Sequence, residues 1–442
     1  MANETRNVTT TVDLLGIGIG PFNLGLAALL QRVPEVEAVF LERQRQFAWH
    51  PGMMVEGTTL QVPFFADLVT MADPTHPLSF LSYLHQQGRL YHFYFLEKFH
   101  ITRKEYSHYC EWAAKQLASC RFGIQAESVT YAPDRGVFLV ETQQLESGER
   151  TSWEAKNVVL GVGSTPAVPA PFRSQLGPRV LHSSAYMPNR AECLASRSIT
   201  VIGSGQSAAE IVLDLIRRQS EHGYRVDWFT RSEGFFPMEY SKLGLEHFSP
   251  DYTSYFYNLP AERRDELRRR QGLLYKGISA RTIADIYDAL YEAGEAGGSA
   301  SSVRLLACTE VQGVERCGEA GPYRLHCRHL QQETSFVHES DTVILATGYE
   351  HAEPACLASL EPYLQRDSLG RLDIEESYAV RLDPSVKGRL FIQNGELHTH
   401  GVGAPDLGLG AYRSSVIINQ LAGREVYRVQ ERHVFQQFGV GR

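Results

Sequence analysis

Two glycine-rich turns, about 190 residues apart, constrain the fold of this chain more than any other feature. The first, Gly16-x-Gly18, lies between an apolar strand pattern at 12–15 and a helical pattern at 23–31. The second, G-x-G-x-x-A beginning at Gly203, lies in the same setting. Strand, glycine turn and helix in this order open the βαβ units that bind dinucleotides, because small residues let the backbone approach a pyrophosphate at a helix N-terminus. The sequence therefore predicts an α/β fold with two Rossmann-like dinucleotide-binding domains.

The residue that ends the second strand of each unit indicates which dinucleotide the unit binds. The strand pattern at 37–41 ends at Glu42, where a carboxylate would bind the hydroxyls of an unphosphorylated adenosine ribose. The pattern at 225–230 ends at Arg231, whose guanidinium suits the 2′-phosphate of NADPH. These residues favour FAD at the first turn and NADPH at the second. Taken alone, the first motif could be an ordinary glycine-rich strand turn, and Arg231 could be a solvated arginine at a strand end.

The order of these patterns predicts a nested domain organisation, with a small, mostly helical substrate-binding segment. The expected bounds are 12–190 and 346–425 for the FAD-binding domain, 191–235 and 300–345 for the NADPH-binding domain, and 236–299 for the helical segment. Residues 47–80 and 234–260 show no clear periodicity and are expected to be loops. Further helices are expected at 104–119, 260–271, 281–292 and 412–421, and further strands at 136–141, 153–160, 341–345 and 389–393.

Composition limits the classes of ligand. The chain has 442 residues, enough for two to three domains, and its 21 Tyr and 21 Phe supply ample surface for a core. The formal net charge is −8, which provides neither the basic patch of a nucleic-acid-binding protein nor a polybasic membrane patch. Small-molecule ligands are therefore expected, with neither nucleic acid nor a membrane as partner.

The cysteines and the apolar run near the N-terminus indicate a cytoplasmic protein. The seven cysteines include no C-x-x-C pair, which argues against a zinc site, a disulfide framework and a dithiol redox centre. The apolar run at 12–30 contains Asp13, Pro21 and four glycines, so it is expected to be a buried strand, turn and helix rather than a membrane span or signal peptide. His398 and His400 lie near Glu396 but lack a further ligand at helical spacing, so no metal is expected.

Several longer motifs resemble those of one enzyme family. They are GIGIGPFNL from Gly16, FAWHPGM from Phe47, LQVPFFADLV from Leu60, VIGSGQSA from Val201, LATGY from Leu345 and HGVG from His400. The set resembles the flavin-dependent N-hydroxylating monooxygenases, the lysine, ornithine and diamine N-hydroxylases of hydroxamate siderophore biosynthesis. The resemblance runs from about residue 12 to about residue 425. Pro21, an unusual residue for a generic Rossmann turn, is the residue that this family uses.

The resemblance implies an enzyme that uses FAD, NADPH and O₂. NADPH reduces the flavin, the reduced flavin activates O₂, and a neutral amine of the substrate accepts an oxygen atom in a site from which water is excluded. By motif, Gln61 and Asn394 would be catalytic, with Gln61 at the junction of flavin and substrate. The FAD-binding residues would be Gly16, Gly18, Gly20, Pro21, Glu42, Trp49, His50, Gln61, Thr347, Gly348, Asp406, Leu407 and Leu409. The NADPH-binding residues would be Gly203, Gly205, Gln206, Ser207 and Arg231.

Two departures from the family pattern concern the substrate. Family members that hydroxylate free amino acids carry a lysine where this chain has Ala66, and ornithine-type members carry an asparagine that aligns roughly with Leu245. Both of those side chains bind the α-carboxylate of the substrate, and alanine and leucine would leave it buried and unpaired. The expected substrate is therefore an aliphatic diamine, cadaverine or putrescine. The candidate partners of its distal ammonium are Glu246, Glu239 and Asp251.

Two alternatives remain open from the sequence. An L-lysine N6- or L-ornithine N5-hydroxylase could bind the carboxylate through another cation, such as Lys242 or Lys276. A non-catalytic flavin- or NADP-binding sensor would also keep both glycine turns. Because the family tends to form tetramers, a homo-oligomer is expected.

Overall fold

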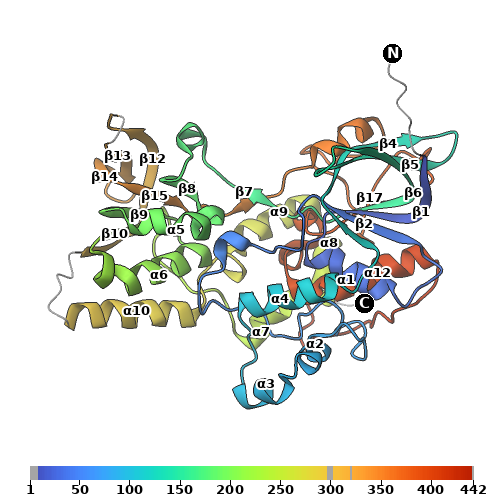
Figure 1. Cartoon of the computed structure of the whole chain (residues 1–442), viewed down its shortest axis with the longest axis horizontal. Helices are drawn as coiled ribbons and strands as arrows, with labels where there is room; N and C mark the ends of the chain where they lie inside the picture. The colour runs from blue at the N-terminus through green and yellow to red at the C-terminus, as the bar shows by residue number, and fades with distance from the viewer. Residues whose placement is uncertain (1–7, 296–301, 319–320, 441–442) are drawn as a thin grey trace.

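The computed structural model describes residues 8–295, 302–318 and 321–440. Two α/β units lie at opposite ends of its long axis, and helices from two separate stretches of the chain lie between and below them (Figure 1). Each unit contains a sheet with parallel strands, so the predicted α/β class with two Rossmann-like domains is confirmed. None of the described helices is long and apolar enough to cross a bilayer.

The first unit is built on an eight-stranded sheet with the order β17-β18-β6-β1-β2-β3, to which β5 attaches through β6 and β4 through β5. β1 (Val8–Ile17) is parallel to β2 (Ala38–Glu42) and β6 (Arg150–Leu160), so these strands end at one edge of the sheet. Helix α1 (Pro21–Leu30) is buried on nearly every side and packs against α12 (Gly410–Ala422). The remaining strands are β3 (Cys120–Phe122), β4 (Ile124–Ala132), β5 (Val137–Gln144), β17 (Ala379–Val380) and β18 (Leu390–Ile392).

The second unit is built on a five-stranded sheet, β11-β10-β9-β15-β8, in which all neighbouring strands are parallel. Helices α6 (Gln206–His222) and α10 (Ala280–Glu295) cover one face, where Trp228 is buried. Its neighbour Phe229 points to the opposite face and joins the core beneath the antiparallel sheet β12–β14. The strands are β8 (Val180–His182), β9 (Ser198–Ile202), β10 (Arg225–Phe229), β11 (Val303–Leu306), β12 (Thr309–Arg316), β13 (Tyr323–His329), β14 (Thr334–Ser340) and β15 (Thr342–Leu345).

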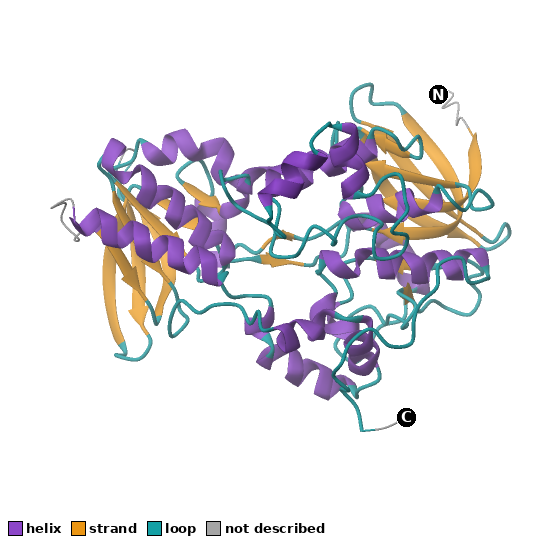
Figure 2. Ribbon diagram, turned by 90° about the horizontal axis from the view of Figure 1, so that it is seen from below, coloured by secondary structure: helices purple, strands orange, loops and turns teal. Residues whose placement is uncertain are grey.

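Figure 2 shows helices between the two groups of strands and to one side of them. Many of these helices come from two insertions. The first, between β2 and β3, contains α2 (Phe80–Gln86), α3 (Leu90–Leu96) and α4 (Arg103–Ala114). The second, between β10 and β11, contains α7 (Lys242–Leu245), α8 (Pro250–Tyr257) and α9 (Ala261–Arg270). α8 and α9 pack against α11 (Leu397–His400), so the second insertion is attached to the C-terminal part of the first unit.

The structure differs from the expected bounds in three places. β8 pairs with β15, so the second unit already includes Val180 and does not begin at 191. α10 packs on α6 through Ile283 and Ile286, so it belongs to the second unit and not to the helical segment. The region 234–260 contains α8, because Ser249 caps the helix by accepting the Tyr252 N–H and Pro250 suits its first turn.

Candidate active site

The first glycine turn lies at the carboxyl end of β1 and leads directly into α1. Gly18 has φ +87°, and a Cβ there would lie 2.6 Å from the Gly161 carbonyl oxygen, so only glycine fits. Helix α1 begins after Gly20 with Pro21 in its first turn and without a side-chain cap, which leaves its N-terminus open to an anion. Gly16 serves packing, because a Cβ there would lie 2.1 Å from the Phe40 ring. The turn has the shape of a pyrophosphate cradle.

Glu42 ends β2 beside this turn. One carboxylate oxygen accepts the backbone N–H of Ile19 (2.9 Å) and the other accepts that of Gln44 (2.9 Å). These two bonds hold the half-buried carboxylate at the turn, and each oxygen keeps a lone pair for a further donor. The position fits the predicted contact with ribose hydroxyls.

Trp49 and His50 lie where the two units meet. Trp49 packs edge-to-face on Tyr106 of α4, and His50 packs in the same way on Tyr349, which follows the second sheet. Desolvation, with the nearby Arg103 guanidinium, lowers the pKa of His50 to about 4. The imidazole is therefore neutral at neutral pH and can take part in hydrogen bonds to a flavin without adding charge.

Two side-chain amides directly after β18 have buried oxygen atoms that accept no hydrogen bond from the described residues. Gln393 donates from Nε2 to Asn23 Oδ1 (2.7 Å), and Asn23 donates to the Gly18 carbonyl (2.8 Å), which ties this strand to the first turn. Among the described residues, the Oε1 atom of Gln393 and the Oδ1 atom of Asn394 are buried without a hydrogen-bond partner. Since native proteins rarely leave such atoms unpaired, these oxygens fit a bound group that donates hydrogen bonds. Sequence reasoning selected Asn394 but missed Gln393 and Asn23.

A buried ion pair supports this junction. Arg413 of α12 lies 3.1 Å from Glu396, and the side chains are 1% and 0% exposed. The guanidinium also donates to the Ala404 carbonyl and lies over the Phe22 ring. Nothing in the local sequence marked Arg413, because its partner Glu396 looked like a loop carboxylate.

The histidines near Glu396 make polar contacts within the fold. His398 contacts the Leu372 carbonyl (2.8 Å), and His400 contacts Thr399 Oγ1 (2.8 Å) and the Glu376 carbonyl (3.3 Å). Burial lowers the pKa of His400 to about 3, so this imidazole is neutral. Among the described residues there is no group of three metal-ligating side chains.

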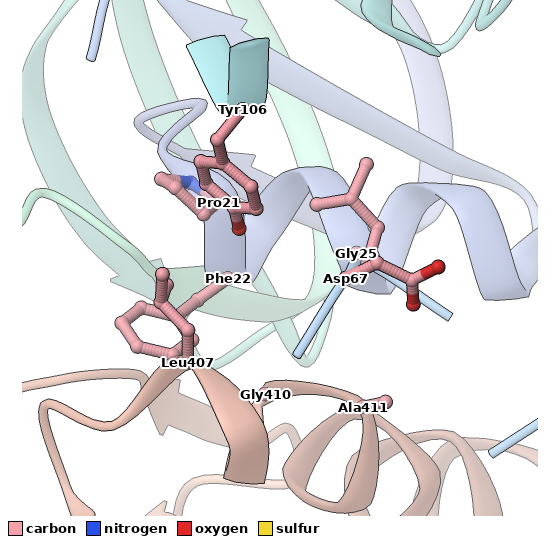
Figure 3. A pocket seen from close by; sticks show the side chains of 9 residues that line it. Pro21, Phe22, Gly25, Asp67, Tyr106, Leu407, Gly410 and Ala411 are labelled. Atoms are coloured by element: carbon pink, nitrogen blue, oxygen red, sulfur yellow. The ribbon is translucent and has the colours of Figure 1, made fainter. Parts of the chain in front are cut away.

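A small pocket lies between α1, α4 and the start of α12. Figure 3 shows side chains from these elements converging on it; the lining includes Pro21, Phe22, Asp67, Tyr106 and Leu407. The pocket joins the first turn to the segment that carries Ala66 and to the predicted FAD-binding residues 406–409. The buried Leu409 completes the packing of that segment.

Gln61, Ala66 and Asp406 lie on one wall of this region. The Tyr240 hydroxyl donates to the backbone oxygen (3.0 Å) or the Oε1 atom (3.2 Å) of Gln61. Burial, with the Asp406 charge, raises the pKa of Tyr240 to about 12. Asp406 Oδ1 accepts the Gly408 N–H (2.7 Å), and a Cβ on Gly408 would lie 4.0 Å from the Ala66 Cβ. Burial raises the pKa of Asp406 to about 6, against the effects of the Gly408 N–H and of Arg413.

The predicted holders of a distal ammonium do not point into this region. Glu246 accepts the backbone N–H groups of Phe435 (3.1 Å) and Gln436 (2.9 Å) near the C-terminus. Asp251 likewise binds His433, with 2.8 Å between Oδ2 and Nδ1. Glu239 accepts the N–H of Ser241 in its own turn, and Leu245 is 40% exposed. The structure thus assigns these three acids to structural contacts.

The second glycine turn lies between β9 and α6. Gly203 has φ +135°, and a Cβ there would lie 2.2 Å from the Ala346 carbonyl oxygen. Gly205 precedes α6, which begins without a side-chain cap, and Ser207 is its second residue. Arg231 follows β10, is exposed and forms no ion pair with any residue that the structure describes. The geometry fits the predicted phosphate cradle with a free guanidinium beside it.

Gln206 connects this turn to both neighbouring elements. Its Oε1 accepts the Ser279 N–H (2.7 Å) before α10, and its Nε2 donates to Thr282 (3.0 Å) and to Glu210 (2.8 Å). Glu210 is 3% exposed and pairs with Arg103 of α4, 2.8 Å away. Arg103 and Glu210, which the sequence did not single out, therefore join the second turn to the helices of the first unit.

Thr347 and Gly348 lie in the connection between the units. Thr347 Oγ1 donates to the Ala167 carbonyl (2.6 Å), and the Gly348 carbonyl oxygen contacts His182 Nε2 (2.9 Å). The adjoining strands β7 (Thr165–Pro166) and β16 (Tyr349–Glu350) form a two-stranded bridge. A direct contact of these two residues with FAD stays a prediction.

Two dinucleotide-type turns in separate parallel sheets, with buried polar side chains between them, are typical of a two-module oxidoreductase. The family model described as L-lysine 6-monooxygenase/L-ornithine 5-monooxygenase matches residues 10–351, and the chain belongs to this family. The predicted family resemblance is therefore confirmed.

Individual relatives match over nearly the whole chain. A rhizobactin siderophore biosynthesis protein of Rhizobium meliloti is 48% identical over 98% of this chain and 96% of its own. A putrescine N-hydroxylase of Shewanella oneidensis is 42% identical over 99% of this chain and 86% of its own. The FAD-bound crystal structure of DfoA, a cadaverine monooxygenase of desferrioxamine biosynthesis from Erwinia amylovora, is 41% identical with a TM-score of 0.93, and the match covers 98% of this chain and 100% of that one.

Proposed function

We propose that this chain is an NADPH- and FAD-dependent monooxygenase that N-hydroxylates one terminal amine of an aliphatic diamine, cadaverine or putrescine, for hydroxamate siderophore biosynthesis. The relatives named above as a putrescine N-hydroxylase and a cadaverine monooxygenase support the diamine substrate. The observation that carries the choice is Ala66, which is 6% exposed and packs near Gly408 on the wall that holds Gln61. Alanine at this position supplies no positive charge that could bind the carboxylate of an amino acid.

The residues of the first unit fit FAD. The cradle at Gly18 would take the pyrophosphate, Glu42 the adenosine ribose, and the orphaned oxygens of Gln393 and Asn394 would accept hydrogen bonds from the flavin side. The bound flavin supplies the redox and oxygen chemistry, and the chain binds, orients and excludes water. The neutral imidazole of His50 and the aromatic ring of Trp49 would help to keep the junction dry.

The residues of the second unit fit NADPH. The turn at Gly203 and Gly205 with the open N-terminus of α6 would take the pyrophosphate, and Arg231 the 2′-phosphate. Gln206 is held by Ser279, Thr282 and Glu210, so it would bind from a fixed position.

The two amines of a diamine would have different roles at the wall formed by Gln61, Ala66 and Asp406. A free alkyl ammonium has a pKa of about 10.4, so the reacting amine must lose its proton on binding. Gln61, held by Tyr240, would orient that amine. Asp406 is ionised above pH 6 and shares the wall with Ala66, so it would hold the distal ammonium in place of Glu246, Glu239 and Asp251. We also propose that the chain forms a homotetramer in the cytoplasm.

The test is coupled turnover. Purified FAD-loaded enzyme is given NADPH and O₂ with putrescine, cadaverine, lysine or ornithine, and hydroxylamine product is measured beside NADPH oxidation. Coupled product from a diamine, with near-background product from lysine and ornithine, is expected. Comparable hydroxylation of lysine or ornithine would assign the chain to the amino-acid hydroxylases, and flavin and NADPH binding without any product would favour a sensor.

A further inference from the structure

The α3 helix presents an apolar surface that nothing in the chain covers. None of its seven residues is buried, and Tyr91, Tyr94 and Phe95 are 78%, 69% and 74% exposed. Of the 24 exposed large hydrophobic side chains among the described residues, nine fall between residues 65 and 99. We call these nine the α3 face: Phe65, Met71, Leu81, Leu90, Tyr91, Tyr94, Phe95, Leu96 and Phe99. Soluble monomers rarely expose so many apolar side chains together.

A hollow of about 290 Å³ opens beside this helix. Phe64, Phe65, Phe80 and Leu81 form its apolar lining, and Thr70 and Ser82 contribute polar edges. An apolar cavity of about 150 Å³ holds a benzene ring, so the hollow has room for an aromatic side chain. The same surface therefore carries protruding aromatic rings and a recess that can receive one.

We propose that the α3 face is an interface between two copies of this chain, in which α3 of each copy packs over the hollow of the other about a two-fold axis. A two-fold interface must be self-complementary, and a surface with both the rings and the recess meets that condition. At roughly 200 Å² for each large side chain, the nine exposed fractions amount to on the order of 1,000 Å² per copy. A standard interface needs about 800 Å² per partner.

The charges around the α3 face favour a second copy over other partners. The α3 segment Leu90–Leu96 contains no Asp, Glu, Lys or Arg. Arg89, just before it, is held by both oxygens of Glu105. Glu97 and Lys98, which follow α3, are exposed and of opposite charge, so the face carries no cluster of cations of the kind that attracts anionic lipid headgroups. Because these two charges balance, two copies of the face can meet without net like-charge repulsion.

The interface would lie behind the wall of the candidate active site. Phe64 contacts Phe93 of α3 and Phe99 through its ring, and Phe65 stacks on Phe64. Asp67 lines both the hollow and the pocket of Figure 3. Ala66 lies between Phe65 and Asp67 in the chain. A second copy would therefore support the segment that carries Ala66.

The test compares the mass of charged variants in solution by sedimentation velocity, on FAD-loaded full-length protein. Tyr91→Glu and Phe95→Glu place a carboxylate on the α3 face, and Tyr287→Glu is the matched control because Tyr287 is 70% exposed on α10, in the other unit. We expect both α3 variants to have half the mass of the wild type or less, and the control to keep it. A cooperative thermal melt and unchanged flavin absorbance will show that the variants are folded.

Three outcomes would overturn the proposal. The wild type could be a monomer throughout the micromolar range, the α3 variants could keep the wild-type mass, or the control could dissociate as readily as they do. Flotation with phosphatidylglycerol vesicles tests the other explanation of an exposed apolar face, which is membrane binding. A monomeric wild type that binds vesicles, and loses binding on Phe95→Glu, would assign the surface to membranes. Each outcome is independent of which amine the enzyme hydroxylates.

Discussion

Placing a cation at residue 66 should reverse the substrate preference. Ala66 is 6% exposed on the wall shared by Gln61 and Asp406, so an ammonium introduced by Ala66→Lys would lie within the substrate region. Two unit charges about 6 Å apart repel by about 3 kcal/mol at an effective dielectric constant of about 20, which is roughly a hundredfold in binding. Pairing of the new ammonium with Asp406 would act in the same direction, because it would remove the partner of the distal ammonium. We expect the KM for cadaverine and putrescine to rise by about a hundredfold.

The control and the amino-acid substrates distinguish charge from size. Ala66→Met adds a side chain of similar length without charge, so it should raise the diamine KM far less than the lysine variant. Lysine, whose carboxylate gains a partner, should become a better substrate of Ala66→Lys than of the wild type. The assay is hydroxylamine formation per NADPH oxidised across the four substrates. Equal losses in the methionine and lysine variants, or an unchanged diamine KM, would refute the electrostatic reasoning.

Four further changes test the cofactor sites and the supports of the substrate region. Arg231→Ala should raise the KM for NADPH at least tenfold, since a charge-assisted contact contributes about 1.5–3 kcal/mol, and should leave the KM for NADH nearly unchanged; equal losses with both coenzymes would remove Arg231 from the 2′-phosphate. Gly18→Val should yield protein without flavin absorbance, because a Cβ would lie 2.6 Å from the Gly161 oxygen, and a fully yellow variant would reject the first turn as the FAD site. The pKa of Asp406 is raised to about 6, so the neutral acid stabilises the fold, and this contribution is lost as the pH rises from about 4 through 6. The Tm of Asp406→Asn, measured relative to the Tm of the wild type, should therefore be higher at pH 8 than at pH 5. An equal difference in Tm at both pH values would contradict the raised pKa. Glu246→Ala should make the chain near Phe435 more sensitive to limited proteolysis than Glu239→Ala does, because only Glu246 binds those amides, and equal cleavage would show that the two bonds are dispensable.

The two glycine turns and the charged residues beside them could be predicted because they are encoded locally. A strand, a glycine turn and a helix follow one another within about twenty residues, and the acidic or basic end of the next strand follows soon after. The observed positions of Gly18, Glu42 and Gly203 agree with those patterns because backbone sterics at each turn leave little choice. Asn394 was found only through the family motif, and its unpaired Oδ1 atom is visible only in the folded chain.

The substrate side could not be predicted in the same way, because its residues are arranged by contacts between distant parts of the chain. Glu246 looked like a free acid near a substrate, but it binds amides 189 and 190 residues further along. Asp251 is bound by His433, 182 residues away. β8 joins the second sheet through β15, about 160 residues further along, so the domain bound also depended on a distant partner.

Glu210 shows how these distant contacts bear on function. In the sequence it is one more glutamate in an amphipathic helix, yet it is 3% exposed and has two partners from different parts of the molecule. Gln206, four residues earlier at the second glycine turn, donates to one oxygen, and Arg103 of α4 lies 2.8 Å from the other. A buried carboxylate is costly without its cation, so a rotation that separates α6 from α4 must either expose Glu210 to water or carry Arg103 with it. The same residue thus fixes the glutamine of the second glycine turn and resists displacement of that turn from helix α4 of the first unit.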